Sequence, residues 1–267
     1  MGLGKSRQVS AFLRGLFNSN LISKAIIVAP LSVIYQWKPE LTKVGLQSKM
    51  FTEGNSKIHL TALENVGKEG GIVLTTYETI RDHKQKISDK LGTVDYIFAD
   101  EGHRIKNEAG KASKALKGIR CDHRIVVTGT PIQNNLMEFY SLMKFCNPTL
   151  LGNKEEFKET FLVPIDRGKF KGSTPSARRK AIESSEDLNK LVSPFVLRRS
   201  KMTLKDSGRI KANKYEVIVW VKISAHQANL YEALMVDPNP RSRKHGGAFE
   251  ISKYRWNDKR QEYFTTI

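Results

Sequence analysis

The chain has 267 residues, of which 39% are hydrophobic and 9% aromatic, so it can form a sizeable packed core. Its 45 lysines and arginines outnumber its 27 acidic residues, and the net charge of +18 points to a polyanionic partner. No apolar run approaches the roughly 20 residues that a membrane span needs, and the first residues do not form a signal peptide. Cys121 and Cys146 have neither metal-ligand spacing nor a disulfide pattern, so we expect two reduced thiols.

The first 150 residues alternate short β-branched runs with longer amphipathic stretches. The runs are almost entirely apolar, which is typical of strands buried on both faces of a parallel sheet. We expect strands at Lys24–Pro30, Gly71–Tyr77, Asp95–Asp100 and His123–Thr128. We expect helices between them at Ser6–Phe17, Ser32–Val44, Ala109–Gly118 and Asn135–Phe145. This order predicts an α/β fold with a doubly wound parallel sheet, whose ligand sites lie at the carboxyl ends of the strands.

The pattern changes after about residue 150. Residues 151–203 are expected to be helical and basic, residues 204–236 to form a linker and the start of another lobe, and residues 237–267 to be a polar tail of unassigned role. Within the second segment, Tyr215–Ile223 reads as a strand and is followed by a helix through Met235. The stretch Asp166–Lys214 holds 14 basic and five acidic residues, a net charge of +9, so it is either a solvated basic linker or a contact surface for DNA or for another lobe.

The first motif is a glycine-rich loop at the start of the chain, Gly2-Leu3-Gly4-Lys5-Ser6. Glycines allow backbone N–H groups to close around phosphate oxygens, and the helix that follows presents its positive end. In such a loop Lys5 reaches the β- and γ-phosphates and the Ser6 hydroxyl is a Mg²⁺ ligand.

A second motif is the apolar strand Ile97–Ala99, which ends in two acids. Asp100 is placed to hold hydrated Mg²⁺, and Glu101 to polarise an attacking water. A pair of helix-capping acids is the alternative, which the presence of a phosphate loop in the same chain disfavours.

A third motif follows the next predicted strand and consists of Thr128, Gly129, Thr130 and Gln133. Small hydroxyl residues at a strand end can contact the γ-phosphate region and the acids beside it. The same stretch can also be a turn before a helix that is capped by Asn134 or Asn135, and the two interpretations are compatible.

These motifs, in this order, resemble those of the SWI/SNF-type superfamily 2 ATPases. The resemblance covers roughly residues 1–235 and rests on MGLGKS, APLSVIYQW (29–37), LTTYE (74–78), DEGH (100–103), TGTPIQNNL and LRRSK (197–201). Within that family the chain resembles the excision-repair cross-complementing group 6-like branch, by DEGH, NNLMEFYSL, VPIDRG…STPSARRKA and SPFVLRRSK. A DEAD-box RNA helicase would carry Asp-Glu-Ala-Asp and Ser-Ala-Thr instead, so duplex DNA is favoured over RNA.

The resemblance implies a RecA-like ATP-binding lobe that uses ATP and Mg²⁺. The loop Gly2–Ser6 matches the nucleotide loop, Asp100 and Glu101 match the Mg²⁺ and hydrolysis pair, and His103 matches a position that links these acids to the Thr-Gly-Thr element. Gln133 matches a position near the cleft between two lobes, and Arg198 and Arg199 match a segment that bridges them.

The resemblance also implies one side of a DNA track, reached through sequence-independent backbone contacts. The matching residues are Pro30, Ser32, Trp37, Thr75, Thr76 and Tyr77, to which Arg104, Lys106 and Asn107 can add phosphate contacts. Trp37 fits packing on the sheet as well as it fits DNA contact.

The resemblance implies a function for a longer protein, an ATP-driven translocase on duplex DNA or chromatin in the nucleus. Relatives place a strand before the phosphate loop and a second RecA-like lobe with an arginine finger after this region, and we expect both to be missing here. An arginine finger contributes about 10³–10⁵ in kcat, so we expect this chain alone to hydrolyse ATP very slowly. The alternative is a noncatalytic module that binds DNA or nucleotide.

Overall fold

The computed structural model describes residues 3–52, 56–129, 135–199 and 223–236, the strands at 254–257 and 262–265, and the single positions 217, 219 and 221. The chain divides into two compact units, Met1–Ser207 and Gly208–Ile267. The first unit contains the sheet and the predicted motifs, so it is the unit that positions the site.

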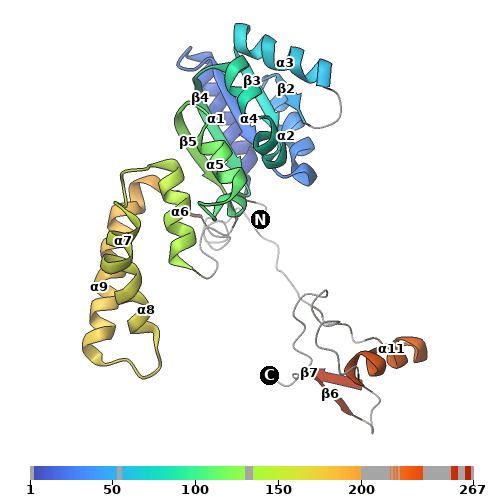
Figure 1. Cartoon of the computed structure of the whole chain (residues 1–267), viewed down its shortest axis with the longest axis vertical. Helices are drawn as coiled ribbons and strands as arrows, with labels where there is room; N and C mark the ends of the chain where they lie inside the picture. Colours follow the sequence, from blue (N-terminus) through green and yellow to red (C-terminus); the bar gives the residue numbers. More distant parts are fainter. Residues whose placement is uncertain are drawn as a thin grey trace. The chain divides into compact units, whose positions relative to one another are not determined.

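A five-stranded parallel sheet forms the centre of the first unit (Figure 1). Its strands are β1 (Lys24–Val28), β2 (Ser48–Phe51), β3 (Gly71–Thr75), β4 (Val94–Asp100) and β5 (Cys121–Val127), in the spatial order β2-β3-β1-β4-β5. In the central strand, Ile26 lies opposite Val73 on one side and opposite Ile97 on the other. Because all five strands run the same way, their carboxyl ends meet at one edge, where the motifs of the sequence are found.

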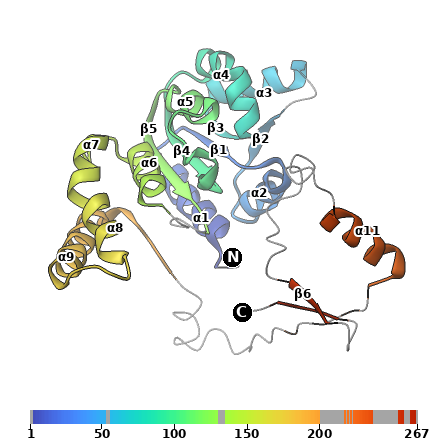
Figure 2. The same cartoon turned by 60° about the horizontal axis from the view of Figure 1, so that its bottom comes forward.

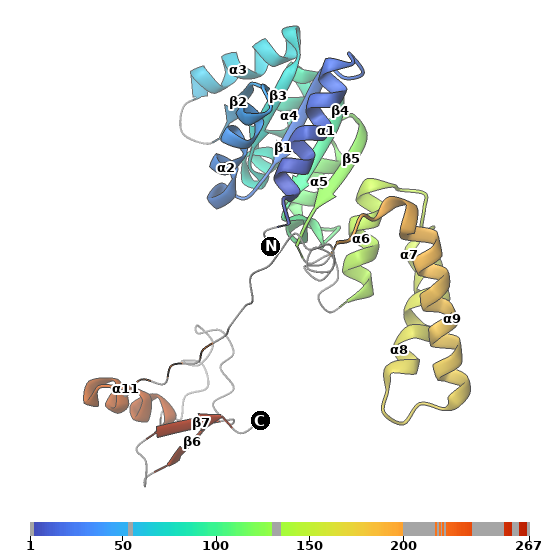
Figure 3. The same ribbon diagram turned by 180° about the vertical axis from the view of Figure 1, so that it is seen from behind.

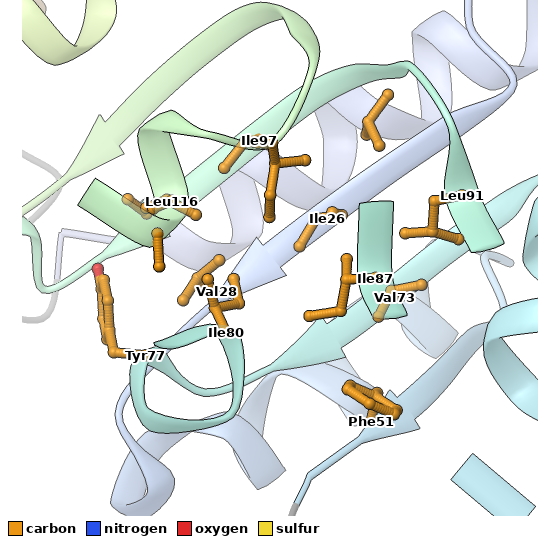
Figure 4. Close-up of a cluster of buried hydrophobic side chains, with 14 of the residues drawn as sticks. Ile26, Val28, Phe51, Val73, Tyr77, Ile80, Ile87, Leu91, Ile97 and Leu116 are labelled. Carbon is orange, nitrogen blue, oxygen red and sulfur yellow. The ribbon is translucent and has the colours of Figure 1, made fainter. Parts of the chain in front are cut away.

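Helices cover both faces of this sheet, because successive side chains of a strand point to opposite faces. Ile26 and Val28 of β1 lie in a cluster with side chains of α3 (Ser56–Glu69), α4 (Tyr77–Leu91) and α5 (Lys111–Lys117), part of which is drawn in Figure 4. Ala25 and Ile27 lie in a second cluster with α1 (Lys5–Asn18) and α2 (Leu31–Lys43). Figure 3 shows this second face, with α1 in front of the sheet. The α/β fold predicted from the sequence is therefore confirmed.

The four strands predicted for the first 150 residues are all present, with small errors at their ends. The strand predicted as Gly71–Tyr77 ends at Thr75, since Thr76 is the N-cap of α4 and its Oγ1 accepts a hydrogen bond from Thr79 N. The strand predicted as Lys24–Pro30 ends at Val28, and Pro30 precedes α2. The sequence did not predict β2, α3 or α4.

The helical region that follows β5 has a core of its own. It consists of α6 (Leu136–Cys146), α7 (Lys154–Phe157), the π-helical turn η2 (Lys158–Leu162), α8 (Val163–Lys169), α9 (Pro175–Val192) and the 3₁₀ turn η3 (Ser193–Phe195). Phe157 and Tyr140 are almost completely buried in this core, with ring centroids 4.8 Å apart. Helix α6 joins the two cores, because Leu142 and Phe145 pack in the cluster on the sheet.

The second unit contains α11 (Ala225–Val236) and the antiparallel strands β6 (Tyr254–Asn257) and β7 (Glu262–Thr265). The helix confirms the prediction for this stretch, and the two strands were not predicted. The strand predicted at Tyr215–Ile223 is not found at 217, 219, 221 and 223, and its other positions lie outside the described residues. No helix in the described part of the chain is both long and apolar enough for a membrane span.

Candidate active site

The predicted phosphate loop leads directly into α1. Gly4 adopts the left-handed conformation with φ of 71°, and Lys5 is the first residue of the helix. No side chain caps this end of α1, so the N–H groups of its first turn point outward without a side-chain acceptor. Leu3, Lys5 and Ser6 are half-buried at this end, and Gly2 lies outside the described residues. An uncapped helix start behind a left-handed glycine suits an anionic ligand.

The two acids lie where β4 ends. Asp100 is 4% exposed and Glu101 is half-buried. Glu101 adopts the left-handed conformation, with φ of 49° and ψ of 53°, which is uncommon for a residue other than glycine. Its backbone N–H donates to Asp100 Oδ1 at 2.9 Å. The sharp turn after β4 therefore places two adjacent carboxylates at the carboxyl edge of the sheet, followed by the 3₁₀ turn η1 (Gly102–Ile105).

Burial raises the pKa of Asp100 above its ordinary value, and the nearby charge of Glu101 acts in the same direction. Two hydrogen bonds, from Trp37 and from the Glu101 backbone, and the positive charge of Lys5 partly offset this rise in the pKa. The carboxylate thus lies in a partly dry environment beside a cation, where the positive charge of a metal ion would favour its ionised form.

The phosphate loop, the acids and the third motif come together at this edge. A Cβ atom placed on Gly129 would lie 3.6 Å from Lys5 Nζ, so the lysine reaches the end of β5. His103 Nδ1 lies 3.3 Å from Glu101 Oε2. In Figure 2 the N-terminus lies beside the start of α1, and the arrowhead of β5 points to the same end. Thr130 and Gln133 lie outside the described residues, whereas Asn135 caps α6 by accepting a hydrogen bond from Met137 N.

Five of the residues expected on the DNA side are buried, Pro30 among them, which corrects that prediction for their side chains. Trp37 is 1% exposed, Thr75 0%, Thr76 4% and Tyr77 3%. Trp37 packs in the cluster beneath α2, which was the alternative open in the sequence, and Thr76 caps α4. A residue in a nearly all-apolar strand or on the inner face of a helix is removed from solvent whatever its polarity, and this explains the error.

The remaining residues of that group are exposed. Ser32 lies in the first turn of α2, and Arg104, Lys106 and Asn107 lie in or just after η1. Arg104 forms an ion pair with Glu78 at 2.6 Å, and Lys106 forms one with Glu138 at 2.9 Å. All four residues are open to an anionic partner, which at Arg104 and Lys106 would compete with the carboxylates of Glu78 and Glu138.

Two further residues lie next to predicted site residues, and neither of them was predicted from the sequence. Gln8 Nε2 donates to the carbonyl of Leu3 in the loop at 3.0 Å, and Gln8 Oε1 accepts from Arg199 Nη1 at 2.8 Å. Tyr35 is 63% exposed on α2, close to Ser32. A surface glutamine and a tyrosine belong to no motif, so no sequence signal marks them.

The donor set of this edge suits Mg²⁺. The described residues contain no group of three or more His, Cys, Asp or Glu side chains that could enclose a metal ion. One buried carboxylate, Asp100, and one hydroxyl, Ser6, lie instead at the motif edge. Mg²⁺ usually keeps several waters and binds through one or two carboxylates together with phosphates, so this sparse set fits that ion.

Comparison with known proteins agrees with the geometry. The model of the SNF2-related domain matches residues 1–261. The SNF2 domain-containing protein ENL1 of Oryza sativa subsp. japonica is 39% identical over 251 residues, which are 88% of this chain and 25% of that protein. The human DNA excision repair protein ERCC-6-like is 32% identical over 259 residues, which are 86% of this chain and 21% of that protein.

A solved structure matches at the level of the fold as well. The Sulfolobus solfataricus SWI2/SNF2 ATPase core in complex with dsDNA is 34% identical, with a TM-score of 0.62 over 87% of this chain and 45% of that one. The chain therefore spans about a quarter of the two relatives and less than half of this ATPase core. From the family model, these relatives and the arrangement of the motifs, the chain belongs to the SNF2-related family.

Proposed function

We propose that this chain provides the nucleotide-binding lobe of a DNA-dependent ATP hydrolase that translocates on duplex DNA. The observation that supports this most is the meeting of Lys5 with the strand-end residues Asp100 and Gly129 at one edge of the sheet. Phosphoryl transfer requires mainly positioning and charge stabilisation, and this edge brings together a cation, an uncapped helix start and two acids.

In this proposal each residue has a separate task. The first turn of α1 and Lys5 bind the phosphate groups of ATP, while Ser6 and Asp100 hold Mg²⁺, which neutralises phosphate charge when it is bound. Glu101 orients the attacking water and accepts its proton. His103 lies 3.3 Å from the Glu101 carboxylate and holds it toward the end of β5. The motif residues Thr128, Gly129, Thr130 and Gln133 report the state of the nucleotide.

The DNA partner is proposed from charge and from exposed side chains. The net charge of +18 favours a polyanion, and Ser32, Arg104, Lys106 and Asn107 are exposed near the site. The similarity to the Sulfolobus ATPase core in complex with dsDNA supports duplex DNA as the track. We further propose a nuclear protein of the ERCC-6-like branch that acts on chromatin or in DNA repair, working with a second RecA-like lobe.

The test is ATP hydrolysis by the full-length protein with and without duplex DNA. We expect DNA to stimulate turnover, and we expect Lys5→Ala and Glu101→Gln each to abolish it. Glu101→Gln should still bind ATP, because it keeps the phosphate-binding residues and loses only the group that accepts the proton.

Glu155→Gln is the matched control, since it removes an exposed carboxylate at the start of α7, outside the motifs. Normal hydrolysis in Glu101→Gln would refute the role of Glu101. Binding of DNA and nucleotide without hydrolysis in the unmodified full-length protein would instead support the noncatalytic alternative.

A further inference from the structure

Asp100 is held at three oxygen atoms by donors from three different segments. Its Oδ2 accepts a hydrogen bond from Trp37 Nε1 at 2.8 Å, and its Oδ1 accepts one from Glu101 N at 2.9 Å. Its backbone carbonyl accepts a third bond from the Tyr77 hydroxyl at 2.6 Å. The short aspartate side chain is therefore fixed in position and in rotation, and two of its three donors, Trp37 and Tyr77, lie outside the phosphate loop and the strand-end acid pair.

Both aromatic donors are buried, and each places its polar group against Asp100. Trp37 is 1% exposed in the cluster under α2, and Tyr77 is 3% exposed in the cluster under α4. Figure 4 shows the Tyr77 ring at the border of that cluster, with its oxygen directed away from the apolar side chains. Burying an indole N–H or a carboxylate without a hydrogen-bond partner raises the free energy of the folded state. The Trp37–Asp100 bond therefore stabilises this arrangement beyond the packing of the ring itself.

The helices that supply these donors also reach the surface that we propose for DNA. On α2, Ile34, Trp37 and Leu41 face the core, whereas Leu31, Ser32 and Tyr35 are exposed. Helix α4 begins at Tyr77, and its next residue, Glu78, forms the ion pair with Arg104. A shift of either helix start on the outside therefore changes a hydrogen bond to Asp100 on the inside.

Resting on the proposed function, we propose that Trp37 and Tyr77 are positioning residues that fix Asp100 for Mg²⁺ and connect the DNA-facing starts of α2 and α4 to it. The Trp37 N–H fixes which Asp100 oxygen remains open, and the Tyr77 hydroxyl fixes the backbone from which the carboxylate extends. If the two residues served only core packing, replacing them would lower the stability of the fold and leave the Mg²⁺ concentration needed for nucleotide binding unchanged.

The first test measures the Mg²⁺ concentration that half-saturates binding of a fluorescent ATP analogue to the 267-residue chain. Trp37→Phe keeps an aromatic ring and removes the donor to a charged acceptor, so we expect that concentration to rise about ten- to hundredfold. Tyr77→Phe removes a bond to a neutral carbonyl, and we expect a rise of about three- to tenfold. Nucleotide binding without Mg²⁺ should be unchanged in both variants.

Tyr140→Phe is the matched control. It removes a buried tyrosine hydroxyl that likewise donates to a backbone carbonyl, that of Gly152 at 3.2 Å, in the separate core of the helical region. It should leave the Mg²⁺ requirement at the wild-type value. An unchanged Mg²⁺ requirement in Trp37→Phe, with folding verified by circular dichroism, would overturn the inference.

A second test uses Trp37 as its own reporter. With Trp220→Phe and Trp256→Phe in place, Trp37 is the one tryptophan left in the chain. We expect its emission to shift when Mg²⁺ is added with nucleotide, to shift when a short duplex DNA is added alone, and to lose both responses in Asp100→Asn. If the Trp37 emission changes with neither addition, the proposed connection between the helix starts and Asp100 is wrong.

The failures of the two proposals are distinguishable. If the wild-type chain binds the ATP analogue equally with and without Mg²⁺, the proposed function fails, and the positioning role fails with it. If the wild-type chain requires Mg²⁺ and Trp37→Phe requires the same concentration, only the positioning role fails.

Discussion

A hydrogen bond between Asp95 and Lys24 connects the starts of two neighbouring strands. Asp95 Oδ2, at the beginning of β4, accepts a hydrogen bond from the backbone N–H of Lys24, at the beginning of β1, at 2.7 Å, and another from Ser23 N at 2.7 Å. Burial alone would raise the pKa of Asp95, but these backbone bonds, the Ser23 hydroxyl and the Lys24 charge outweigh it and hold the pKa below its ordinary value. The ionised form of Asp95 therefore stabilises the sheet.

The first prediction concerns Asp95→Asn, which keeps the shape of the side chain and removes its charge. Hydrogen bonds to a charged group contribute about 1.5–3 kcal/mol, and partial exposure to solvent reduces this to about 1 kcal/mol of unfolding free energy at pH 7. Because the folded pKa is lowered, this stabilisation is present above the ordinary pKa near 4 and is lost as the pH falls through the folded value. Urea unfolding between pH 7 and pH 3 should show the difference shrinking, and a difference independent of pH would contradict the assignment.

The second prediction compares two helical glycines. A Cβ atom on Gly67 in α3 would lie 2.1 Å from the Lys90 backbone carbonyl of α4, so Gly67→Ala must push the helices apart and should cost about 1–3 kcal/mol. A Cβ atom on Gly15 in α1 meets nothing within 4 Å, so Gly15→Ala should stabilise the protein by up to about 1 kcal/mol. Thermal unfolding of both variants measures this, and a Gly67→Ala variant as stable as the wild type would show that α3 and α4 do not pack this closely.

The third prediction concerns the two thiols. Burial raises the pKa of Cys121 and of Cys146 to about 11, and both are free and half-buried. Since the thiolate is the reactive form, both should react slowly with a disulfide reagent at pH 8, and the rate should rise about tenfold per pH unit toward pH 10. Full reactivity at pH 8 should appear only on unfolding in urea, and rapid reaction of the folded chain would contradict the burial.

The parts of the fold that sequence reasoning found are those with strong periodic signals. The runs that became β1, β3 and β4 are largely buried strands with few polar residues, and each ends in a motif. The run that became β5 also ends in a motif, but β5 lies at an edge of the sheet and only Val127 of it is buried, so the expectation of burial on both faces was wrong for this strand. Strand β2 was missed because four residues, Ser48–Phe51, at an edge of the sheet carry too little pattern. Helix α4 was missed because it is rich in charge and begins directly after a strand, where Tyr77 reads as a continuation of the apolar run.

The site was predictable where chemistry prescribes residue types and spacing. Lys5, Asp100, Glu101 and Gly129 belong to motifs, and the parallel sheet brings their strand ends together. The inward direction of Trp37 was not predictable, because α2 is amphipathic and a tryptophan suits either face of a helix. Its bond to Asp100 joins residues 63 positions apart, which only the packing of α2 on the sheet decides.

The fourth prediction concerns the ion pair of Arg104 and Glu78 at the proposed DNA surface. If Arg104 contacts phosphate in the complex, Glu78 competes with DNA for the same guanidinium, since both side chains are partly exposed and 2.6 Å apart. We expect Arg104→Ala to weaken binding of a short duplex and to reduce the slope of log K against log salt by about one. Glu78→Gln should strengthen binding, because it releases Arg104 and removes a negative charge.

The control for this prediction is Lys90→Ala, which breaks a similarly exposed pair, with Glu64 at 2.6 Å, at the other end of α4. It removes the same charge as Arg104→Ala, so it separates a local phosphate contact from the general attraction of a basic protein for DNA. Fluorescence anisotropy across a salt series would measure all three variants. Equal slopes for Arg104→Ala and Lys90→Ala, together with no gain in Glu78→Gln, would mean that Arg104 serves only to hold η1 against α4. The DNA surface would then have to be sought at Ser32 and the exposed side of α2, because α2 begins shortly after β1 ends at the motif edge and its Tyr35 and Leu31 are exposed.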